Sequence, residues 1–353
     1  MQPNVALGEL FLLIIGLILC FSIYQSFVIL FIAASCFLFL QYYRDGEKTN
    51  IYRFCIFFVS VFLISYLVYS VISKIWFSSS TYLTSQILWQ EDNIIGCIKN
   101  ILLHIESVVL GHNIFFTIGY FFSLVLLAVQ IIIRCSSRHN FKLNITTILA
   151  FFLLEISPFL LTIYLGGQPL IRTQWALPLV ISANFILFFS YCTYKKIKYV
   201  VIGFAIILGM QQLHTVCRLE YTDQLRYQHD VQVASMLSHD LEENGLKDKP
   251  VAFIGNLPFN IPPSGIRGEI IGISFFDFDM VSDPHYYMSS VRIVGFMNAI
   301  GEEITCVQPE NILYARRLAQ NMPCWPQEGG IKDAGDYVVV KLSEDEYYEK
   351  DFG

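Results

Sequence analysis

The chain contains little charge, and this scarcity limits what the protein can be. Only 15% of its 353 residues are Asp, Glu, Lys or Arg, whereas about a quarter are charged in a typical soluble protein. Hydrophobic residues make up 55% of the chain. The net charge of −6 excludes a general binder of polyanions, so nucleic acid is not an expected partner. The composition predicts a polytopic membrane protein.

The sequence also lacks the spacings that mark common metal and cofactor sites. Its nine cysteines form no CxxC pair and no Cys/His cluster with zinc-binding spacing. It has no P-loop, no glycine-rich dinucleotide turn and no Ser/His/Asp arrangement. His104 and His112 stand on one predicted helix at a spacing that need not turn them to the same side. We therefore expect no metal and no cofactor.

Long apolar runs fill the first part of the chain. A helix of about 20 apolar residues crosses the ~30 Å hydrocarbon core of a membrane. By this measure the sequence predicts about seven spans: Leu7–Ile23, Phe27–Tyr43, Ile51–Ile72, Ile114–Ile133, Ile145–Leu165, Trp175–Tyr194 and Tyr199–Met210. We predict a transmembrane helical domain over residues 1–214.

Basic residues in the short loops predict the orientation of these spans. They cluster at Arg44–Arg53, Arg134–Lys142 and Lys195–Lys198, and with seven spans all three clusters fall on one side. An excess of Lys and Arg marks the cytoplasmic side. The opposite side then receives the Tyr24-Gln25 turn, the long loop Ser73–Asn113, the loop that contains Arg172 and everything after about Leu213.

Acidic residues are rare in this part of the chain. Glu91 and Asp92 are adjacent in the long loop Ser73–Asn113, whose apolar spacing predicts one or two helices in the membrane interface. Glu155 lies inside a predicted span, three residues before Pro158. Such an acid indicates either a functional site or a carboxyl group that meets a neighbouring helix near a proline kink.

From Thr215 the composition becomes that of a soluble domain. A helix is predicted over Glu220–Asn244, with Gly245 as its C-cap. Strand patterns follow at Val251–Gly255, Val291–Phe296 and Tyr337–Leu342, and a helical pattern at Glu310–Gln320. Strands that alternate with helices predict a small α/β domain over residues 215–353, on the non-cytoplasmic side.

Two features of this domain allow more than one interpretation. Cys306 and Cys324 lie in a predicted non-cytoplasmic compartment, where they are either a disulfide or free buried thiols. Asp277-Phe278-Asp279 matches the Asp-x-Asp tripeptide that holds a metal in nucleotide-sugar transferases. We do not expect that metal, because the tripeptide is common by chance and an exported domain meets no nucleotide sugar.

Arg172 stands in a short loop, Tyr164–Trp175, between two predicted spans. The loop carries one cation, two glycines and a proline, with an aromatic residue at each edge. Aromatic residues favour the level of the lipid headgroups, and the planar guanidinium of Arg matches phosphate oxygens in a bidentate fashion. Arg172 is therefore either an interfacial anchor or a phosphate ligand.

Several segments match a known pattern in order and spacing, although each is weak alone. They are Cys20–Phe27, Ser157-Pro158, Gly166–Arg172, Lys249–Gly255, Arg292–Phe296, Met322–Pro326 and Val338–Leu342. On these segments the chain resembles the Gtr type II family of bacterial membrane glucosyltransferases. The resemblance covers essentially the whole chain.

The resemblance implies a GT-C-like enzyme of the bacterial inner membrane. Such an enzyme takes glucose, or a related hexose, from a polyprenyl-phosphate carrier at the non-cytoplasmic face. It adds the sugar to a surface polysaccharide such as O-antigen, or to a lipid-linked saccharide. The reaction needs a carboxylate as base and a cation that stabilises the departing lipid phosphate. We assign the cation to Arg172, and Tyr24 and Gln25 to the wall of the sugar pocket.

The chain departs from the family pattern at its start. Family members begin with further spans and carry an acidic pair in an early outer loop, whereas the first outer turn here is only Tyr24-Gln25-Ser26. We therefore expect a member that lacks its N-terminal portion, with Glu91 and Asp92 as the candidate bases. Two other interpretations stay open. One is a non-enzymatic accessory protein of polysaccharide assembly or an inactive truncated transferase, and the other is a transporter that uses Glu155.

Overall fold

The structure is a computed structural model of the chain, and it describes residues 7–44, 51–76, 86–90, 93–137, 141–278 and 286–344. The chain divides into two compact units, Met1–Gln212 and Leu213–Gly353. The boundary falls inside helix α10 (Lys195–Glu243), which contributes residues to both units. Each unit has its own hydrophobic core.

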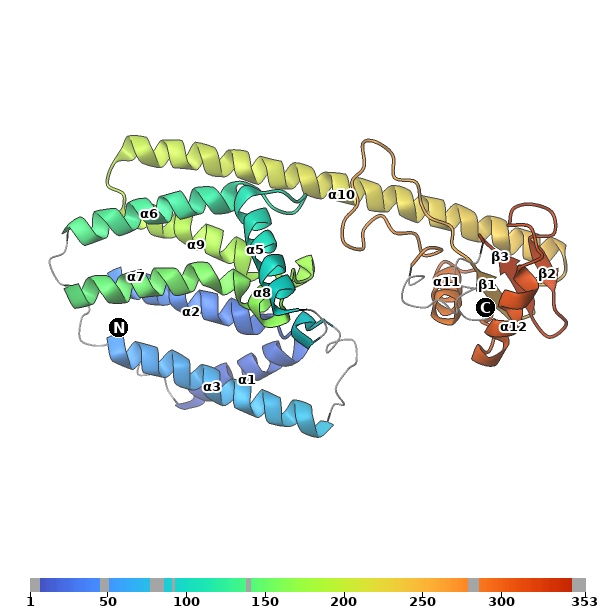
Figure 1. Cartoon of the computed structure of the whole chain (residues 1–353), viewed down its shortest axis with the longest axis horizontal. Coiled ribbons are helices and arrows are strands. Elements are labelled where there is room, and N and C mark those ends of the chain that lie inside the picture. The colour runs from blue at the N-terminus through green and yellow to red at the C-terminus, as the bar shows by residue number, and fades with distance from the viewer. Residues whose placement is uncertain are drawn as a thin grey trace. The chain divides into compact units, whose positions relative to one another are not determined.

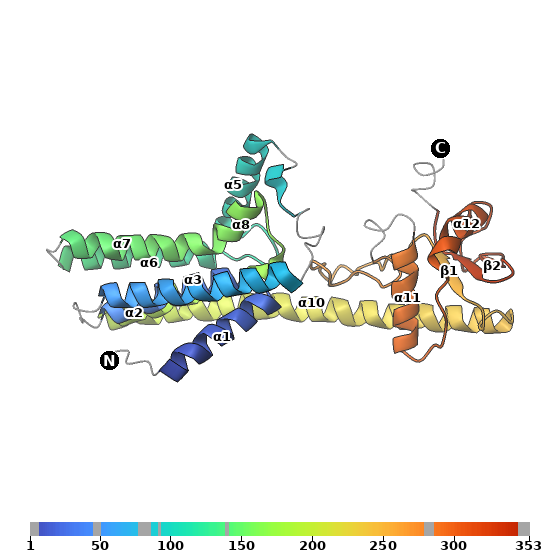
Figure 2. The ribbon, with the colours of Figure 1, turned by 90° about the horizontal axis from the view of Figure 1, so that it is seen from below.

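The first unit is a bundle of apolar helices. The long helices lie side by side, and α5 crosses one end of the bundle (Figures 1 and 2). Helix α2 packs on α7 and α9, α6 packs on α9, and α1 packs on α3. Besides the start of α10, the described elements are α1 (Leu7–Ile23), α2 (Phe27–Arg44), α3 (Ile51–Trp76), η1 (Leu88–Gln90), α5 (Ile94–Leu110), α6 (Gly119–Ser137), α7 (Phe141–Ile156), η2 (Ser157–Phe159), α8 (Leu160–Leu165), η3 (Ile171–Thr173) and α9 (Ala176–Tyr191).

Several of these helices suit a membrane. Among the described residues, three helical segments are long and apolar enough to cross one: Cys55–Trp76, Ile145–Leu165 and a stretch of Lys195–Glu243. Four shorter apolar helices are Gly8–Ile23, Phe27–Tyr42, Gly119–Ile132 and Ala176–Ser190. Large apolar side chains such as Ile56, Leu67 and Ile75 of α3 are exposed. A soluble protein rarely exposes so extensive an apolar surface, so the unit is that of a membrane protein.

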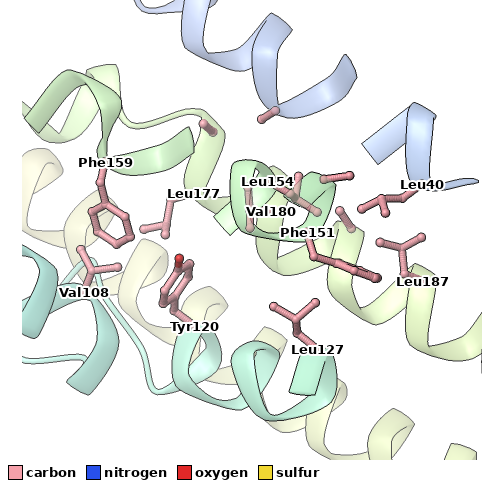
Figure 3. Close-up of a cluster of buried hydrophobic side chains, with 14 of the residues drawn as sticks. Leu40, Val108, Tyr120, Leu127, Phe151, Leu154, Phe159, Leu177, Val180 and Leu187 are labelled. Atoms are coloured by element: carbon pink, nitrogen blue, oxygen red, sulfur yellow. The ribbon is translucent and has the colours of Figure 1, made fainter. Parts of the chain in front are cut away.

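The core of the bundle joins α2, α6, α7 and α9. Figure 3 shows Leu40, Leu127, Phe151 and Leu187 gathered from these four helices, and all four side chains are buried. Four helices that share one core hold their ends in fixed positions. The candidate site lies at one end of this bundle, so the core also positions the site.

Glu155 lies at the edge of this core and is paired with its neighbours. Asn184 Nδ2 of α9 donates a hydrogen bond to Glu155 Oε1 at 2.7 Å. The hydroxyl of Tyr120 of α6 donates to the backbone carbonyl oxygen of Glu155 at 2.9 Å. Glu155 therefore meets two neighbouring helices directly before the turn at Pro158, which is one of the two arrangements that the sequence left open.

Helix α10 corrects the predicted end of the last apolar segment. The sequence predicted a span over Tyr199–Met210 and a separate helix over Glu220–Asn244. The structure has one continuous helix from Lys195 to Glu243, and Gly245 adopts φ 66° just beyond it. The intervening residues contain no proline, so nothing interrupts the helical hydrogen bonds where the composition changes.

The second unit is a three-stranded sheet with helices on both faces. Its strands are β1 (Val251–Ile254), β2 (Ile331–Asp333) and β3 (Val338–Lys341), in the order β1-β3-β2. β3 runs parallel to β1 and antiparallel to β2. Phe253 and Val340 pack with α10 and α11 (Tyr287–Ala299), whereas Ala252 and Val339 pack with α12 (Pro309–Ala319). β1 and β3 are therefore buried on both faces, as expected for such apolar strands.

One sequence expectation in this unit is wrong. The predicted strand Val291–Phe296 is part of helix α11, whose buried residues include Ser290, Ile293, Val294 and Met297. Their spacing is helical, but the short window of β-branched residues concealed it. The strand β2 was not predicted. Cys306 and Cys324, for which a disulfide was one interpretation, are free thiols.

A buried carboxylate fastens the segment after β1 to α10. Asp230 of α10 is fully buried and pairs with Arg226 Nη1 at 3.2 Å. It also accepts hydrogen bonds from Ser274 Oγ at 2.7 Å and from the backbone N–H of Phe275 at 3.0 Å. A buried charge is tolerated only with such partners, so this cluster specifies how residues 274–275 lie on the helix.

Candidate functional site

A pocket lies where distant parts of the sequence meet in the first unit. It encloses about 530 Å³, within the range of about 300–1,000 Å³ that is usual for ligand pockets. We call it the hinge pocket, because the turn between α1 and α2 forms one wall. Its lining is Ser22–Ser26, Tyr69 of α3, Gln86 and Ile87, Leu161, Tyr164 and Leu165 of α8, and Leu170, Arg172 and Thr173.

The hinge wall combines a fixed side chain with an unpaired hydroxyl. Gln25 Nε2 donates to the Tyr69 hydroxyl at 3.0 Å, which ties the turn to α3. The Ser26 hydroxyl is buried and has no hydrogen-bond partner within the described part of the chain. A buried hydroxyl without a partner costs free energy, so Ser26 leaves one polar atom unsatisfied within the wall of the hinge pocket.

The opposite wall is the loop that carries Arg172. Helix α8 ends at Gly166, which adopts φ 77° in the left-handed region that favours glycine. Beyond it, Thr173 Oγ1 donates to the carbonyl oxygen of Leu170 at 2.7 Å, and Gln174 Nε2 donates to that of Pro169 at 3.1 Å. These local bonds form the single turn η3, which places Arg172 at the pocket.

Close packing of the two glycines holds a third wall in place. A Cβ atom on Gly166 would lie 3.1 Å from Trp89 Nε1, and one on Gly167 would lie 2.7 Å from Leu88 Cδ1. Trp89 Nε1 also donates to the carbonyl oxygen of Ile163 at 2.9 Å. The turn η1 is therefore fixed against α8, and Gln86 and Ile87, which precede it, reach the hinge pocket.

Arg172 also lines a second cavity. It encloses about 280 Å³, and we call it the aromatic pocket. Aromatic and aliphatic side chains dominate its lining, among them Phe115, Phe116, Tyr120, Trp175 and Pro178. Arg172 lines both this cavity and the hinge pocket.

His104 of α5 supports the wall of the aromatic pocket from behind. Its Nδ1 lies 2.9 Å from Thr162 Oγ1 of α8, and its ring packs edge-on against Phe116 and Phe159. Burial lowers the pKa of His104, which favours the neutral ring. We interpret His104 as a packing residue that joins α5 to α8.

The structure brings together some of the predicted site residues and leaves others apart. Tyr24, Gln25 and Arg172 line one pocket although they come from both ends of the bundle sequence. Glu91 and Asp92, the predicted bases, lie outside the described residues. They are the two residues between η1 and Asn93, the N-cap of α5. The pocket residues Ser26, Tyr69 and Gln86 were not predicted, since only packing reveals which polar residues of a loop face a cavity.

The other motifs that were considered do not assemble a site in the described parts. His112 follows Gly111, the C-cap of α5, whereas His104 is buried within that helix. Asp277 accepts a hydrogen bond from Asn256 Nδ2 at 2.7 Å, and Asp279 lies outside the described residues. In the segments that the structure describes, no three His, Cys, Asp or Glu side chains gather as metal ligands would.

The fold and the pocket indicate the general class of protein to which the chain belongs. The apolar helices and the small sheet unit are those of a membrane protein with a polar pocket in its helical unit. The family model of the glucosyl transferase GtrII matches residues 4–189, which is more than half of the chain. The chain therefore belongs to the GtrII glucosyl transferase family, and every residue that lines the hinge pocket lies within the match. Comparisons with curated proteins and with solved structures found no match. Family membership supports a membrane enzyme that transfers glucosyl groups.

Proposed function

We propose that this protein transfers glucose from a polyprenyl-phosphate carrier to a cell-surface polysaccharide or lipid-linked saccharide. The hinge pocket would bind the glucosyl phosphate of the donor. The observation that carries this proposal is that Tyr24, Gln25 and Arg172 line one cavity large enough for a sugar phosphate.

The polar walls suit a hexose. Sugar hydroxyls need both donors and acceptors, and the lining offers the hydroxyls of Tyr24 and Tyr69 and the amides of Gln25 and Gln86. Tyr24 adds a ring on which the apolar face of a sugar can pack.

Arg172 suits the phosphate. When the acceptor hydroxyl attacks the anomeric carbon, the bond from that carbon to the phosphate oxygen breaks. The lipid phosphate leaves with that electron pair, and a guanidinium beside it stabilises the charge. Arg172 is exposed at the pocket wall, on a turn held by the bonds of Thr173 and Gln174.

The reaction also requires a group that takes the proton of the acceptor hydroxyl. We propose Glu91 or Asp92 for this base. The support is that Gln86 and Ile87, a few positions earlier in the sequence, line the hinge pocket. Trp89 also ties the intervening turn to α8.

The topology extends the same proposal. We propose seven membrane spans in a GT-C-like arrangement over residues 1–214 of an inner-membrane protein. The α/β domain 215–353 and the hinge pocket would be non-cytoplasmic. Basic residues support this orientation, because Lys142 lies at the start of α7 and Lys195 at the start of α10. The turn between α1 and α2 and the Arg172 loop join neighbouring helices at the ends opposite to those that carry the lysines.

The test is glucose transfer by the Arg172→Ala variant. Membranes that contain the full chain receive polyprenyl phosphate carrying radiolabelled glucose, and label is counted in the polysaccharide and lipid-linked saccharide fraction. We expect kcat/KM to fall by about 10²–10³, as when one donor to a developing anion is removed. Arg172→Lys should recover part of this loss, because it keeps the charge but not the planar fork.

The matched control is Lys196→Ala, which also removes one exposed cation of the first unit but lies at the start of α10. It should insert and transfer normally. If Arg172→Ala inserts normally and transfers glucose at the rate of Lys196→Ala, the phosphate role of Arg172 is wrong. If the unaltered chain transfers no glucose but still binds the donor, a non-enzymatic role in polysaccharide assembly replaces the proposal.

A further inference from the structure

We propose that the aromatic pocket holds the first isoprenoid units of the donor lipid, so that Arg172 separates the lipid chain from the sugar. This inference rests on the proposed function, because it concerns the same donor. It adds a second binding site and a direction: sugar in the hinge pocket, phosphate at Arg172, and apolar chain in the aromatic pocket.

Arg172 lines two cavities that differ in residue type: aromatic and aliphatic side chains predominate in the aromatic pocket, whereas Ser, Thr, Gln and Tyr side chains predominate in the hinge pocket. The hinge pocket and the aromatic pocket share Arg172 as a lining residue, and they share no other. A sugar linked through a phosphate to a long apolar chain has the same order of parts: polar, anionic, apolar. A ligand bound with its phosphate at Arg172 has room for one part on each side.

Apolar side chains predominate in the lining of the aromatic pocket. Its rings and aliphatic groups include Phe115, Phe116, Trp175 and Leu177. Its polar side chains are partly occupied within the protein. The Tyr120 hydroxyl donates to the carbonyl oxygen of Glu155, and the Gln174 amide donates to that of Pro169. The cavity therefore presents mainly apolar surface.

One wall of the aromatic pocket belongs to the packed core of the bundle. Figure 3 shows Val108, Tyr120 and Leu177 close to one another, and all three are buried. They come from α5, α6 and α9 and belong to the core of the bundle. Trp175, at the other wall, is half exposed. The cavity is thus preformed on one side and open on the other, which suits a chain that continues beyond it.

Unsaturated, branched isoprene units fit this lining better than a sugar would. Each apolar carbon that leaves water contributes free energy in proportion to its area, and aromatic walls add contacts with the double bonds. A phospholipid has the same general chemistry of a phosphate with apolar chains. The experiment must therefore distinguish the prenyl chain from a phospholipid chain.

The experiment measures binding of two donors to the full chain in detergent. One donor carries glucose on a long polyprenyl phosphate, and the other carries glucose on methyl phosphate, which has no isoprene unit to enter the aromatic pocket. Pro178→Trp fills the aromatic pocket from an exposed position of α9. We expect this variant to raise the Kd of the long-chain donor by about tenfold. The difference in Kd between the two donors should therefore become smaller.

Ile186→Trp is the matched control, because Ile186 is exposed on the same helix and does not line the cavity. It should leave both Kd values unchanged. A long-chain donor with a photoreactive group on its second isoprene unit gives an independent measurement on the unaltered chain. The label should fall on residues 115–120 or 175–181, and excess polyprenyl phosphate should displace it.

The outcomes separate this inference from the proposed function. If Pro178→Trp binds the long-chain donor as tightly as Ile186→Trp does, or if the label falls elsewhere, the lipid site is wrong. If a photoreactive phospholipid labels the same residues and polyprenyl phosphate does not displace it, the cavity belongs to membrane lipid and the inference is overturned. Arg172→Ala should weaken binding of both donors. If it weakens neither, the proposed function itself fails.

Discussion

Replacing Gly166 with alanine tests how the loop between α8 and α9 shapes the hinge pocket. Gly166 adopts φ 77°, where an L side chain is strained. An added Cβ would lie 3.1 Å from Cys97 Sγ and 3.2 Å from Trp89 Cδ1. Both neighbours must move, and Trp89 cannot move far without weakening its 2.9 Å hydrogen bond to the carbonyl oxygen of Ile163.

The magnitude follows from these two effects. The left-handed backbone costs about 1–2 kcal/mol for a residue with a Cβ. A weakened hydrogen bond costs about 1 kcal/mol. Gly166→Ala should therefore destabilise the first unit by about 2–3 kcal/mol and lower its Tm by several degrees. Glucose transfer should fall as well, because the movement of Trp89 displaces Gln86 and Ile87 from the hinge pocket.

Two other glycines provide matched controls in the same assays, thermal unfolding in detergent and glucose transfer. In Gly167→Ala the nearest neighbour of the added Cβ is Leu88 Cδ1, the end of a flexible side chain, so this variant should cost under about 1 kcal/mol. Gly96→Ala in α5 enters open space and should be neutral or stabilise the helix by up to about 1 kcal/mol. The reasoning is refuted if Gly166→Ala has the Tm and transfer rate of Gly167→Ala.

Two further predictions concern buried ionisable groups. Asp230→Ala leaves Arg226 without its buried partner and should destabilise the second unit by about 3–5 kcal/mol, measured by limited proteolysis in urea. The control is Asp248→Ala, at an exposed position. Equal resistance of the two variants to proteolysis would contradict the role of the cluster. Burial lowers the pKa of His104 from its ordinary value of 6.5, so the unfolded chain binds more protons and stability should fall as the pH drops below about 6.5. His104→Gln should reduce that slope in thermal unfolding, whereas a slope identical to that of the exposed His239→Gln would show that another group causes it.

Much of the fold could be predicted because it depends on local composition. The apolar runs mark the helices of the first unit, since a helix that faces lipid must be apolar over most of its length. The strands predicted over Val251–Gly255 and Tyr337–Leu342 are present as Val251–Ile254 and Val338–Lys341, because short apolar runs of β-branched residues favour a buried strand. Local pattern failed at Val291–Phe296, where the packing of α11 on the sheet overrides the preference of β-branched residues.

For the candidate site, the sequence could nominate individual residues of each loop. Arg172 stands out as a lone cation between two apolar runs, and Tyr24 and Gln25 as polar residues in a short turn. These nominations follow from residue type and predicted topology alone. The roles of all three in binding remain proposals, as do those of Glu91 and Asp92.

Only the tertiary structure decided which of these loops share a cavity. Gln25 forms a hydrogen bond with Tyr69, 44 positions away in the sequence, and Trp89 forms one with Ile163, 74 positions away. Such contacts depend on how helices pack, and packing depends on the fit of side chains from distant segments. For the same reason the sequence alone identified neither the unpaired Ser26 hydroxyl nor the second cavity beside Arg172.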